Sequence, residues 1–353
     1  MMMNFMAAQR WLSVRIQMLG ATSVLFTVVF VVSFSTNIAP GIAAMLIIWS
    51  ANITMSLSFF VQGFSDSEAS MTSLERMLAM TKIPQEEDLS HKTDPVDPSW
   101  PRSGDLTFDK VRLRYRPDLP LSLDGLTFAI KAGQRCGVVG RTGAGKSTLA
   151  AALFRLVELE SGTITFDGVN ISSISLTDVR GRKNGMAIIP QEPVLIPGPL
   201  RQSLDPFGDF QDDAVEEAIR SVFGGRLSDL NAVVEEGGRN FSVGERQLIC
   251  LARAMLAKPK LLFLDEATAS VDGETDAHIQ RMLRLRFQRT TLLTIAHRLG
   301  TVMDYDIILV MDKGKCAEFG SPAELLSNSN GMFYQLVESS GKESASALHS
   351  IVR

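Results

Sequence analysis

A glycine-rich segment between two apolar runs carries the most specific chemistry in the sequence. Residues 135–139 have the pattern of a buried strand, residues 140–148 read Gly-Arg-Thr-Gly-Ala-Gly-Lys-Ser-Thr, and residues 149–157 form a largely apolar, helix-like run. Glycines let consecutive backbone N–H groups converge on phosphate oxygens at a helix N-terminus, where the helix dipole also favours anions. The sequence therefore predicts a phosphate-binding loop (P-loop), with Lys146 at the outer phosphates and the Ser147 hydroxyl on Mg²⁺.

A second apolar run, residues 260–264, ends in the acidic pair Asp265 and Glu266. An aspartate at the carboxyl end of a strand beside a P-loop is suited to holding the metal ion, usually through water. The neighbouring glutamate would then point beyond the third phosphate, where a carboxylate can orient and deprotonate a water molecule. An isolated acidic pair could instead stabilise the start of a helix. Beside a P-loop, the pair favours nucleoside triphosphate hydrolysis.

A second candidate anion site lies between these two motifs. Residues 240–247 read Asn-Phe-Ser-Val-Gly-Glu-Arg-Gln and precede an apolar helical run, so Ser242 and Gly244 stand at a helix N-terminus. One domain would then have two phosphate-binding ends that cannot both reach the same nucleotide. This arrangement indicates head-to-tail pairing, in which each ATP lies between one P-loop and the second site of a partner domain.

These motifs together resemble those of ABC transporters, because residues 240–247 are similar to the ABC signature, usually Leu-Ser-Gly-Gly-Gln. The resemblance implies that Tyr115 stacks on adenine, although a tyrosine in a core strand is the alternative. It implies that Gln191 contacts Mg²⁺ and the attacking water and links the site to membrane helices. It also implies a D-loop at residues 270–272 and a switch histidine at His297 that senses the third phosphate.

The resemblance implies an α/β P-loop ABC ATPase domain, with a mixed-sheet core, an antiparallel β subdomain and an α-helical subdomain. The implied cofactors are ATP and Mg²⁺. The predicted catalytic residues are Glu266, His297 and Gln191; the Mg²⁺ ligands are Ser147, Gln191 and Asp265; and the ATP contacts are Tyr115, Gly140, Arg141, Thr142, Gly143, Ala144, Gly145, Lys146, Ser147, Thr148, Ser242 and Gly244.

The subfamily can be argued from further short segments. The resemblance covers about residues 10–340 and is to the C-terminal nucleotide-binding domain, with the last two membrane helices, of multidrug-resistance-associated proteins, the C subfamily. It rests on Trp-Pro at 100–101, Leu-Arg-Tyr-Arg at 113–116, the P-loop, Leu-Asp-Pro-Phe at 204–207 and Ile-Ala-His-Arg-Leu at 295–299.

Two residues depart from the usual signature: Val243 replaces its first glycine and Glu245 replaces its glutamine. A glutamate facing the ATP of a partner adds negative charge beside phosphates, which should weaken that shared site. The resemblance implies that the site using this signature is the degenerate one. We therefore expect asymmetric hydrolysis, in which the competent site uses this chain's own Lys146, Asp265, Glu266 and His297.

The N-terminal part has a different composition, because residues 16–65 contain no Asp, Glu, Lys or Arg. This run predicts an all-α transmembrane hairpin in residues 1–80, with helices at about 16–36 and 41–62, the second continuing to about residue 80. Lys and Arg occur only outside the turn, at Arg10, Arg15, Arg76 and Lys82, so both ends are expected in the cytoplasm. A secretory signal is the main rival for the first helix, but no cleavage-site pattern follows it.

Polar residues in the second predicted helix leave two interpretations open. They either line a translocation route or join neighbouring helices, because lipid cannot satisfy polar groups. The residues are Asn52, Thr54, Ser56, Ser58 and Gln62.

The remaining composition sets limits on other functions. We expect a linker at 81–103, the nucleotide-binding domain at 104–340 and a C-terminal tail at 341–353. With 35 Lys and Arg against 39 Asp and Glu, no basic surface for nucleic acid is indicated. The cysteines at 136, 250 and 316 are too widely spaced for a zinc site or disulfide framework, and we expect reduced, buried thiols.

Partners and location follow from the resemblance. We expect an integral membrane protein of the plasma membrane or a vesicle or vacuole membrane, with the ATPase domain in the cytoplasm. The implied partners are a second nucleotide-binding domain, from the N-terminal half of the full transporter or from a homodimer, the remaining transmembrane helices, the lipid bilayer and a small-molecule substrate. The implied function is ATP hydrolysis coupled to export of organic anions, thiol conjugates or drugs.

Three alternatives to an exporter belong to other functional classes. A regulatory or channel-type member of the C subfamily would use the same ATP chemistry to gate rather than to pump. A soluble ABC ATPase of DNA repair would lack the hairpin. Because two membrane helices cannot enclose a path, the chain resembles a truncated C-terminal piece, or a non-transporting gene fragment, and we would not predict transport by it alone.

Overall fold

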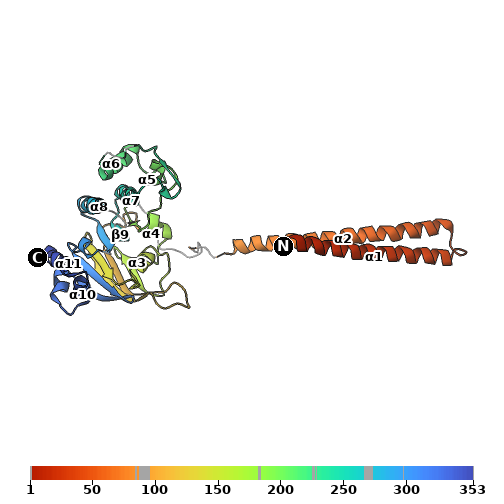
Figure 1. Cartoon of the computed structure of the whole chain (residues 1–353), viewed down its shortest axis with the longest axis horizontal. Coiled ribbons are helices and arrows are strands. Elements are labelled where there is room, and N and C mark those ends of the chain that lie inside the picture. The colour runs from red at the N-terminus through yellow and green to blue at the C-terminus, as the bar shows by residue number, and fades with distance from the viewer. Residues whose placement is uncertain are drawn as a thin grey trace. The chain divides into compact units, whose positions relative to one another are not determined.

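The computed structural model describes residues 2–83, 86, 96–181, 184–224, 227, 229–265, 273–296 and 298–352. The chain divides into two compact units, Met1–Asp88 and Leu89–Arg353. Figure 1 shows a helical hairpin in the first unit and an α/β body in the second.

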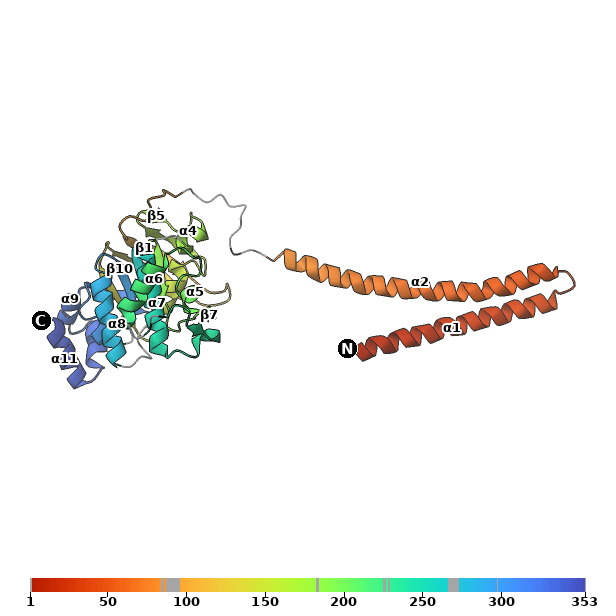
Figure 2. The same ribbon diagram turned by 90° about the horizontal axis from the view of Figure 1, so that it is seen from above.

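The first unit consists of two long helices, α1 (Met2–Ser33) and α2 (Pro40–Thr81), which lie side by side in both ribbon views (Figures 1 and 2). Helix α1 begins well before the uncharged run, which starts at residue 16. Residues 2–15 include Met, Ala, Gln and Leu, and these residue types have high helix propensity. Helix α2 starts with Pro40 at its first turn, a position where the missing N–H costs nothing.

Small side chains form the contact between the two helices. Ile16 and Ser50 are buried, and a Cβ atom placed on Gly20 would lie 2.1 Å from Thr54 Cγ2. Glycine is therefore required at position 20 for this close approach, as at other small-residue contacts between membrane helices.

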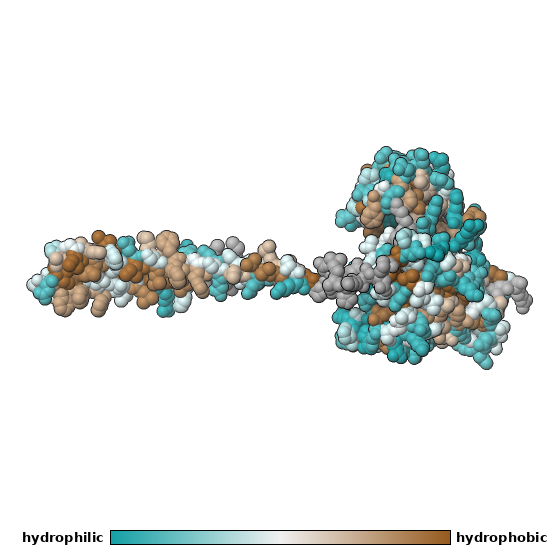
Figure 3. Space-filling view, turned by 180° about the vertical axis from the view of Figure 1, so that it is seen from behind, coloured by the Kyte–Doolittle hydropathy of each residue, from teal (hydrophilic) through white to brown (hydrophobic). Residues whose placement is uncertain are grey.

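Most of the hairpin surface is hydrophobic, as Figure 3 shows for one face. Phe26 and Phe59 expose 74% and 73% of their surface. Arg10–Ser33 and Pro40–Thr81 are long and apolar enough to cross a membrane. A core helix of a globular protein would bury such side chains against its own fold, so their exposure favours contact with lipid or with other helices.

The second unit is built on a six-stranded mixed sheet. Neighbouring strands are parallel except at one edge, where the last two strands of the sequence pair antiparallel. In sheet order the strands are β12 (Lys315–Gly320), β11 (Ile307–Asp312), β3 (Arg135–Gly140), β10 (Thr291–Ile295), β9 (Leu261–Asp265) and β6 (Met186–Ile189).

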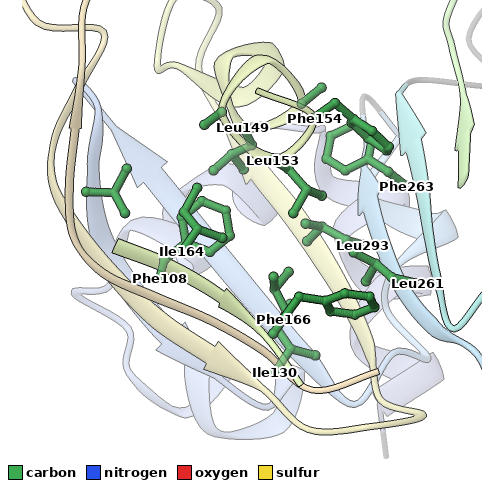
Figure 4. Packing of buried hydrophobic residues seen from close by; sticks show 14 of the residues in the cluster. Phe108, Ile130, Leu149, Leu153, Phe154, Ile164, Phe166, Leu261, Phe263 and Leu293 are labelled. Carbon is green, nitrogen blue, oxygen red and sulfur yellow. The ribbon is translucent and has the colours of Figure 1, made fainter. Parts of the chain in front are cut away.

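An antiparallel sheet packs on the mixed sheet, with helix α3 (Lys146–Leu153) between them. Leu149 and Leu153 of α3 contact both layers, lying among Phe108, Phe166 and Phe263 in one buried cluster (Figure 4). This packing fixes the helix whose first turn carries the P-loop lysine. The antiparallel strands, in sheet order, are β2 (Leu123–Ile130), β1 (Leu106–Leu113), β4 (Ser161–Phe166) and β5 (Val169–Asn170).

Asp167, in the turn after β4, fastens the start of the antiparallel sheet. Its carboxylate accepts hydrogen bonds from the backbone N–H groups of Arg102, Ser103, Gly104 and Asp105. Burial acts to raise the pKa of Asp167, but the bonds from the Ser103 hydroxyl and these amides outweigh it and hold the pKa below its usual value.

A helical subdomain packs on the other part of the mixed sheet. Its core joins Val215 and Ile219 of α6 and Ile249 of α7 to the strand residues Leu262 and Leu264. Its elements are β7 (Gly198–Pro199), α5 (Leu200–Leu204), α6 (Asp212–Phe223), β8 (Val233–Val234), η1 (Glu236–Gly238), α7 (Val243–Ala257) and α8 (Gly273–Arg286). Helix α4 (Leu176–Gly181) instead buries Val179 in the cluster around α3.

Short helices complete the C-terminal part of the unit. The segment 341–353, expected to be a tail, contains helix α11, which buries Ala345 and Leu348. These elements are η2 (Leu299–Thr301), α9 (Pro322–Ser327), α10 (Met332–Glu338) and α11 (Lys342–Val352).

Candidate functional site

The glycine-rich loop runs from the end of β3 to the start of α3. Its last residue, Gly145, adopts a left-handed conformation (φ 96°) and is the N-cap of α3. A Cβ atom at Gly140 would lie 2.3 Å from Met311 O, and one at Gly145 would lie 2.6 Å from Ser122 O. Glycine is therefore needed at both positions, and the cap offers no side-chain acceptor to the first N–H groups of the helix. A phosphate oxygen suits that position.

Lys146 places its charge at this loop. Its side chain is 8% exposed, and Nζ donates hydrogen bonds to Gly140 O at 2.8 Å and Arg141 O at 3.2 Å. The ammonium group is thus held at the carbonyl oxygens that begin the loop. A cation fixed beside helix N–H groups is the electrostatic arrangement that a polyphosphate requires.

Two cavities meet at the loop, and both are lined by Thr142 and Lys146. A cavity of 560 Å³ lies beside Ser147, Thr148 and Lys313, and another of 610 Å³ lies beside Gly140 and Arg298. Their volumes are in the range of small-ligand sites, and their cationic side chains favour an anionic ligand.

Tyr115 lies two residues beyond the end of β1, so it is not a core residue of that strand. It is 49% exposed, and its hydroxyl is 3.3 Å from Thr148 Oγ1, directly after the predicted Mg²⁺ ligand Ser147. An aromatic ring with an exposed face next to a P-loop helix can stack on a nucleobase.

The carboxyl ends of the parallel strands bring further predicted residues to the same edge of the sheet. In the strand register Asp265, the last residue of β9, pairs with Ile295, which pairs with Val138 two residues before Gly140. Gln191, which is exposed, follows the carboxyl end of β6 by two residues, and β6 is the other neighbour of β9. Asp265 and Gln191 thus stand on the edge that carries the P-loop.

The side chains at this edge form a partial set of Mg²⁺ ligands. Among the described residues, no group of three or more His, Cys, Asp and Glu side chains could hold a metal ion by itself. Mg²⁺ commonly binds through one or two carboxylates together with substrate phosphates and water. Ser147, Asp265 and Gln191 provide such a partial set, so they fit an ion that is shared with a nucleotide.

A second helix N-terminus, that of α7, is capped differently. Ser242 is its N-cap, and Ser242 Oγ accepts a hydrogen bond from Glu245 N at 3.2 Å. Glu245 Oε2 in turn accepts bonds from Ser242 N at 2.8 Å and Ser242 Oγ at 2.9 Å. This is a capping box, in which the carboxylate of the helix itself already faces the positive end of α7.

Comparison with known proteins decides the family. The sequence pattern of the ABC transporter family matches residues 123–269, which include the P-loop, the signature segment and Asp265. This chain carries a domain of the ABC transporter family. It is 42% identical over 346 residues to ATP-binding cassette sub-family C member 2 of Rattus norvegicus, covering 96% of the chain and 22% of that protein. It is 43% identical over 348 residues to ABC transporter C family member 12 of Dictyostelium discoideum, covering 97% and 26%.

Two other similar proteins are exporters by name. The chain is 39% identical over 356 residues to the pleiotropic ABC efflux transporter of multiple drugs YBT1 of Candida glabrata, covering 94% of the chain and 21% of that protein. The solved structure of a bacterial Atm1-family ABC exporter with ATP bound matches with a TM-score of 0.77 and 26% identity, covering 94% of the chain and 59% of that structure. The chain spans about a quarter of the length of the curated relatives, in their C-terminal part.

These findings confirm the predicted C-subfamily resemblance and the ABC ATPase fold with its mixed-sheet core and two apolar N-terminal helices. The family is one of ATP-hydrolysing transporter domains, and its ATPase domains bind ATP, typically with Mg²⁺. Relatives of this chain are membrane exporters.

The structure brings part of the predicted ABC site together. The P-loop, Tyr115 and Thr148 are in contact along α3, and Asp265 and Gln191 share their edge of the sheet. Glu266, His297 and the D-loop at 270–272 lie outside the described residues, and they stay predictions. The capping box at the ABC signature was not foreseen, although Ser242 followed three residues later by Glu245 is its sequence pattern.

Proposed function

We propose that this chain binds and hydrolyses Mg-ATP at its own P-loop, and that, within a complete ABC transporter, hydrolysis drives export of organic anions, thiol conjugates or drugs. The observation that carries the proposal is the N-terminus of α3, where a glycine cap and the buried Lys146 stand on the same sheet edge as Asp265. Bound Mg-ATP would supply the reactive phosphoryl group.

The chain's own residues have distinct roles in this proposal. Lys146 and the first amides of α3 hold the outer phosphates, and the Tyr115 ring stacks on the base. Ser147, Asp265 and Gln191 orient Mg²⁺ through direct or water-mediated contacts. Glu266 accepts a proton from the attacking water, and His297 contacts the third phosphate.

The capping box supports asymmetric hydrolysis. In a head-to-tail pair, the phosphate of the partner's ATP would approach Ser242 and the amides that begin α7. Glu245 Oε2 already accepts hydrogen bonds from Ser242 N and Oγ, so an incoming phosphate must displace a carboxylate of like charge. The shared site that uses this signature is therefore the weaker one, and the site built on Lys146 is the competent one.

The hairpin supports membrane partners. Ser50, Thr54 and Ser58 of α2 lie on the face that is shielded by α1, so they serve helix packing. Asn52, Ser56 and Gln62 are exposed on other faces of α2. Because lipid cannot satisfy their amides and hydroxyl, these three require further transmembrane helices or a water-filled path.

We propose an integral membrane location, in the plasma membrane or an internal membrane, with the ATPase unit in the cytoplasm.

Vesicle uptake tests the proposal. Inside-out vesicles carrying the transporter that contains this chain, with Lys146 intact or replaced by Met, are given a labelled thiol conjugate and Mg-ATP. The expected result is ATP-dependent uptake that Lys146→Met abolishes. Nucleotide binding without uptake in the wild type would contradict the pump and favour an ATP-gated regulator.

A further inference from the structure

Helix α11 belongs to the buried cluster that includes the two strand ends preceding the P-loop and the predicted switch histidine. Its buried residues Ala345 and Leu348 share one cluster with Val139 and Ala296. Val139 directly precedes Gly140, the first glycine of the P-loop, and Ala296 directly precedes position 297. These ends belong to adjacent parallel strands, since Ala296 N donates a hydrogen bond to Val138 O at 3.1 Å.

The segment after position 297 is held from two sides. On one side, Val302 is buried in the same cluster as Leu348, and Leu299 packs against that cluster. A Cβ atom built on Gly300 would lie 3.7 Å from Leu348 Cδ2, so Leu348 lies close to this segment. On the other side, Arg298 forms an ion pair of 3.5 Å with Asp276, near the start of α8. Because the Arg298 side chain is half exposed, that pair contributes little, and packing of Leu348 is the stronger anchor.

Helices α10 and α11 also form a wall of a cavity beside the P-loop. The 610 Å³ cavity is lined by Gly140 and Lys146 and also by Leu336, Ala347 and Leu348. Arg298 and Gly300 line the same cavity. Leu348 therefore lines a space that it shares with Lys146 and with the segment after position 297.

We propose that α11 is a positioning element for ATP hydrolysis, with Leu348 holding residues 298–301 in place beside the P-loop. The inference rests on the proposed function, because it acts through the predicted switch residue His297 at the head of that segment. Leu348 touches no reacting atom. Its role is to set the rate of turnover and not the affinity for nucleotide, since Leu149 and Leu153, which fix the helix that begins with Lys146, belong to a different cluster.

Three variants of the full chain test this role. Leu348→Ala removes the anchor, Leu348→Met retains an apolar side chain of similar volume, and Ile351→Ala is the matched control on the same helix, where the side chain is 52% exposed. Hydrogen exchange is followed for the peptide containing residues 299–302, whose turn includes the bonds Thr301 N to Arg298 O and Val302 N to Leu299 O. ATP turnover and Mg-ATP affinity are measured on the same samples.

We expect Leu348→Ala to speed exchange of the 299–302 peptide about tenfold and to lower turnover about tenfold, with the ATP dissociation constant changed less than twofold. Leu348→Met and Ile351→Ala should match the wild type in all three measurements. Unchanged exchange in Leu348→Ala, or a parallel loss of affinity and turnover, would overturn the positioning role. Turnover is measured in the assembled transporter that contains this chain. A wild-type transporter that shows no turnover would refute the proposed function, while the exchange measurement would still decide whether Leu348 holds the segment.

Discussion

The two helix N-termini that carry the nucleotide motifs, at Lys146 of α3 and at Val243 of α7, are capped in opposite ways. Helix α3 has a glycine cap in a left-handed conformation and a lysine side chain folded over the preceding carbonyls. Helix α7 has a serine cap whose N–H and hydroxyl both donate to the Glu245 carboxylate. Both ends have the same dipole, but only the first has its charge arranged for an incoming anion.

This difference shows that a helix N-terminus becomes a phosphate site through its cap. A glycine cap provides no acceptor, so the first amides are directed to a ligand. A capping box provides its own acceptor and stabilises the helix without one. In this chain the capping box stabilises α7, and the proposed function assigns phosphate binding to the glycine-capped end of α3.

Replacing the glycine cap of α3 should have the largest effect, which is a loss of folding stability. Gly145→Ala should destabilise the chain by about 3 kcal/mol, because a left-handed alanine costs about 1–2 kcal/mol and its Cβ also meets Ser122 O. Gly143→Ala is the control: its φ is also positive (81°), but no atom lies within 4 Å of the added Cβ. It should cost only about 1–2 kcal/mol. Denaturant unfolding measures both, and equal losses would show that the Ser122 contact is not limiting.

Removing the lysine charge should have the next largest effect, on binding. Lys146→Met should weaken Mg-ATP binding about 100-fold, since a hydrogen bond to a charged group is worth about 1.5–3 kcal/mol. Lys313→Met is the matched control, because Lys313 lines the same 560 Å³ cavity but lies outside the loop. It should change affinity less than about threefold. Fluorescence titration with a labelled ATP analogue gives both values, and similar losses would argue for a general charge effect.

The subdomain that carries α7 should respond to acid through Asp205. Asp205 is 4% exposed, and its burial acts to raise the pKa of the carboxyl group. Hydrogen bonds from the N–H groups of Phe210 and Asp209, together with the charge of Arg201, outweigh burial and hold the pKa below its usual value. Since the folded pKa is the lower one, Asp205 adds stability that is complete above its unfolded pKa of about 3.9 and is lost as pH falls through the folded pKa. Asp205→Asn should lower stability at pH 7 by about 2 kcal/mol and flatten the decline below pH 4. Unfolding curves from pH 3 to 7 test this, and an unchanged acid profile in the variant would contradict it.

Tyr115 should contribute to the P-loop site through its ring more than through its hydroxyl. Tyr115→Ala should weaken ATP binding about tenfold, because stacking of a base on an aromatic ring is worth about 1–3 kcal/mol. Tyr115→Phe loses only the 3.3 Å contact with Thr148 and should stay within about twofold of the wild type. A larger loss in Tyr115→Phe than in Tyr115→Ala is incompatible with stacking.

The smallest effect should come from the capping box. Ser242→Ala removes the N-cap and should destabilise the helical subdomain by about 1 kcal/mol. Glu245→Gln keeps an acceptor at the same place and should cost less than about 0.5 kcal/mol, while removing the negative charge that opposes a partner's ATP. Thermal unfolding compares the two. If Glu245→Gln were the more damaging change, the carboxylate would have a stabilising role beyond the cap.

Much of the fold could be predicted because its signals are local. The P-loop pattern at 140–148 specifies strand, turn and helix together, and the uncharged run at 16–65 defines the hairpin. The start of α1 at Met2 was not predicted, because the expected helix was bounded by the uncharged run, and residues 2–15 include Arg10 and Arg15. Helix α11 was missed for another reason: a short segment shows its role only when Ala345 and Leu348 are seen to pack on distant strands.

Some residues of the candidate site could also be predicted from local motifs, and others could not. Lys146 and Asp265 were placed from motifs, because strand ends in a parallel sheet meet at one edge. The effect of Glu245 on a partner's ATP stays a prediction. The structure adds that its carboxylate also accepts hydrogen bonds from Ser242 of its own helix, which sequence analysis did not predict.

Turnover by Glu266→Gln tests the central claim that this chain supplies the competent catalytic half. The variant is compared with the wild type in the assembled transporter, with Mg-ATP affinity measured in parallel. The account predicts ATP affinity within about twofold of the wild type and hydrolysis slower by about 100-fold or more, because general-base catalysis typically contributes about 10²–10⁴ in rate. Hydrolysis at the wild-type rate would contradict it, and would place the competent site on the partner domain.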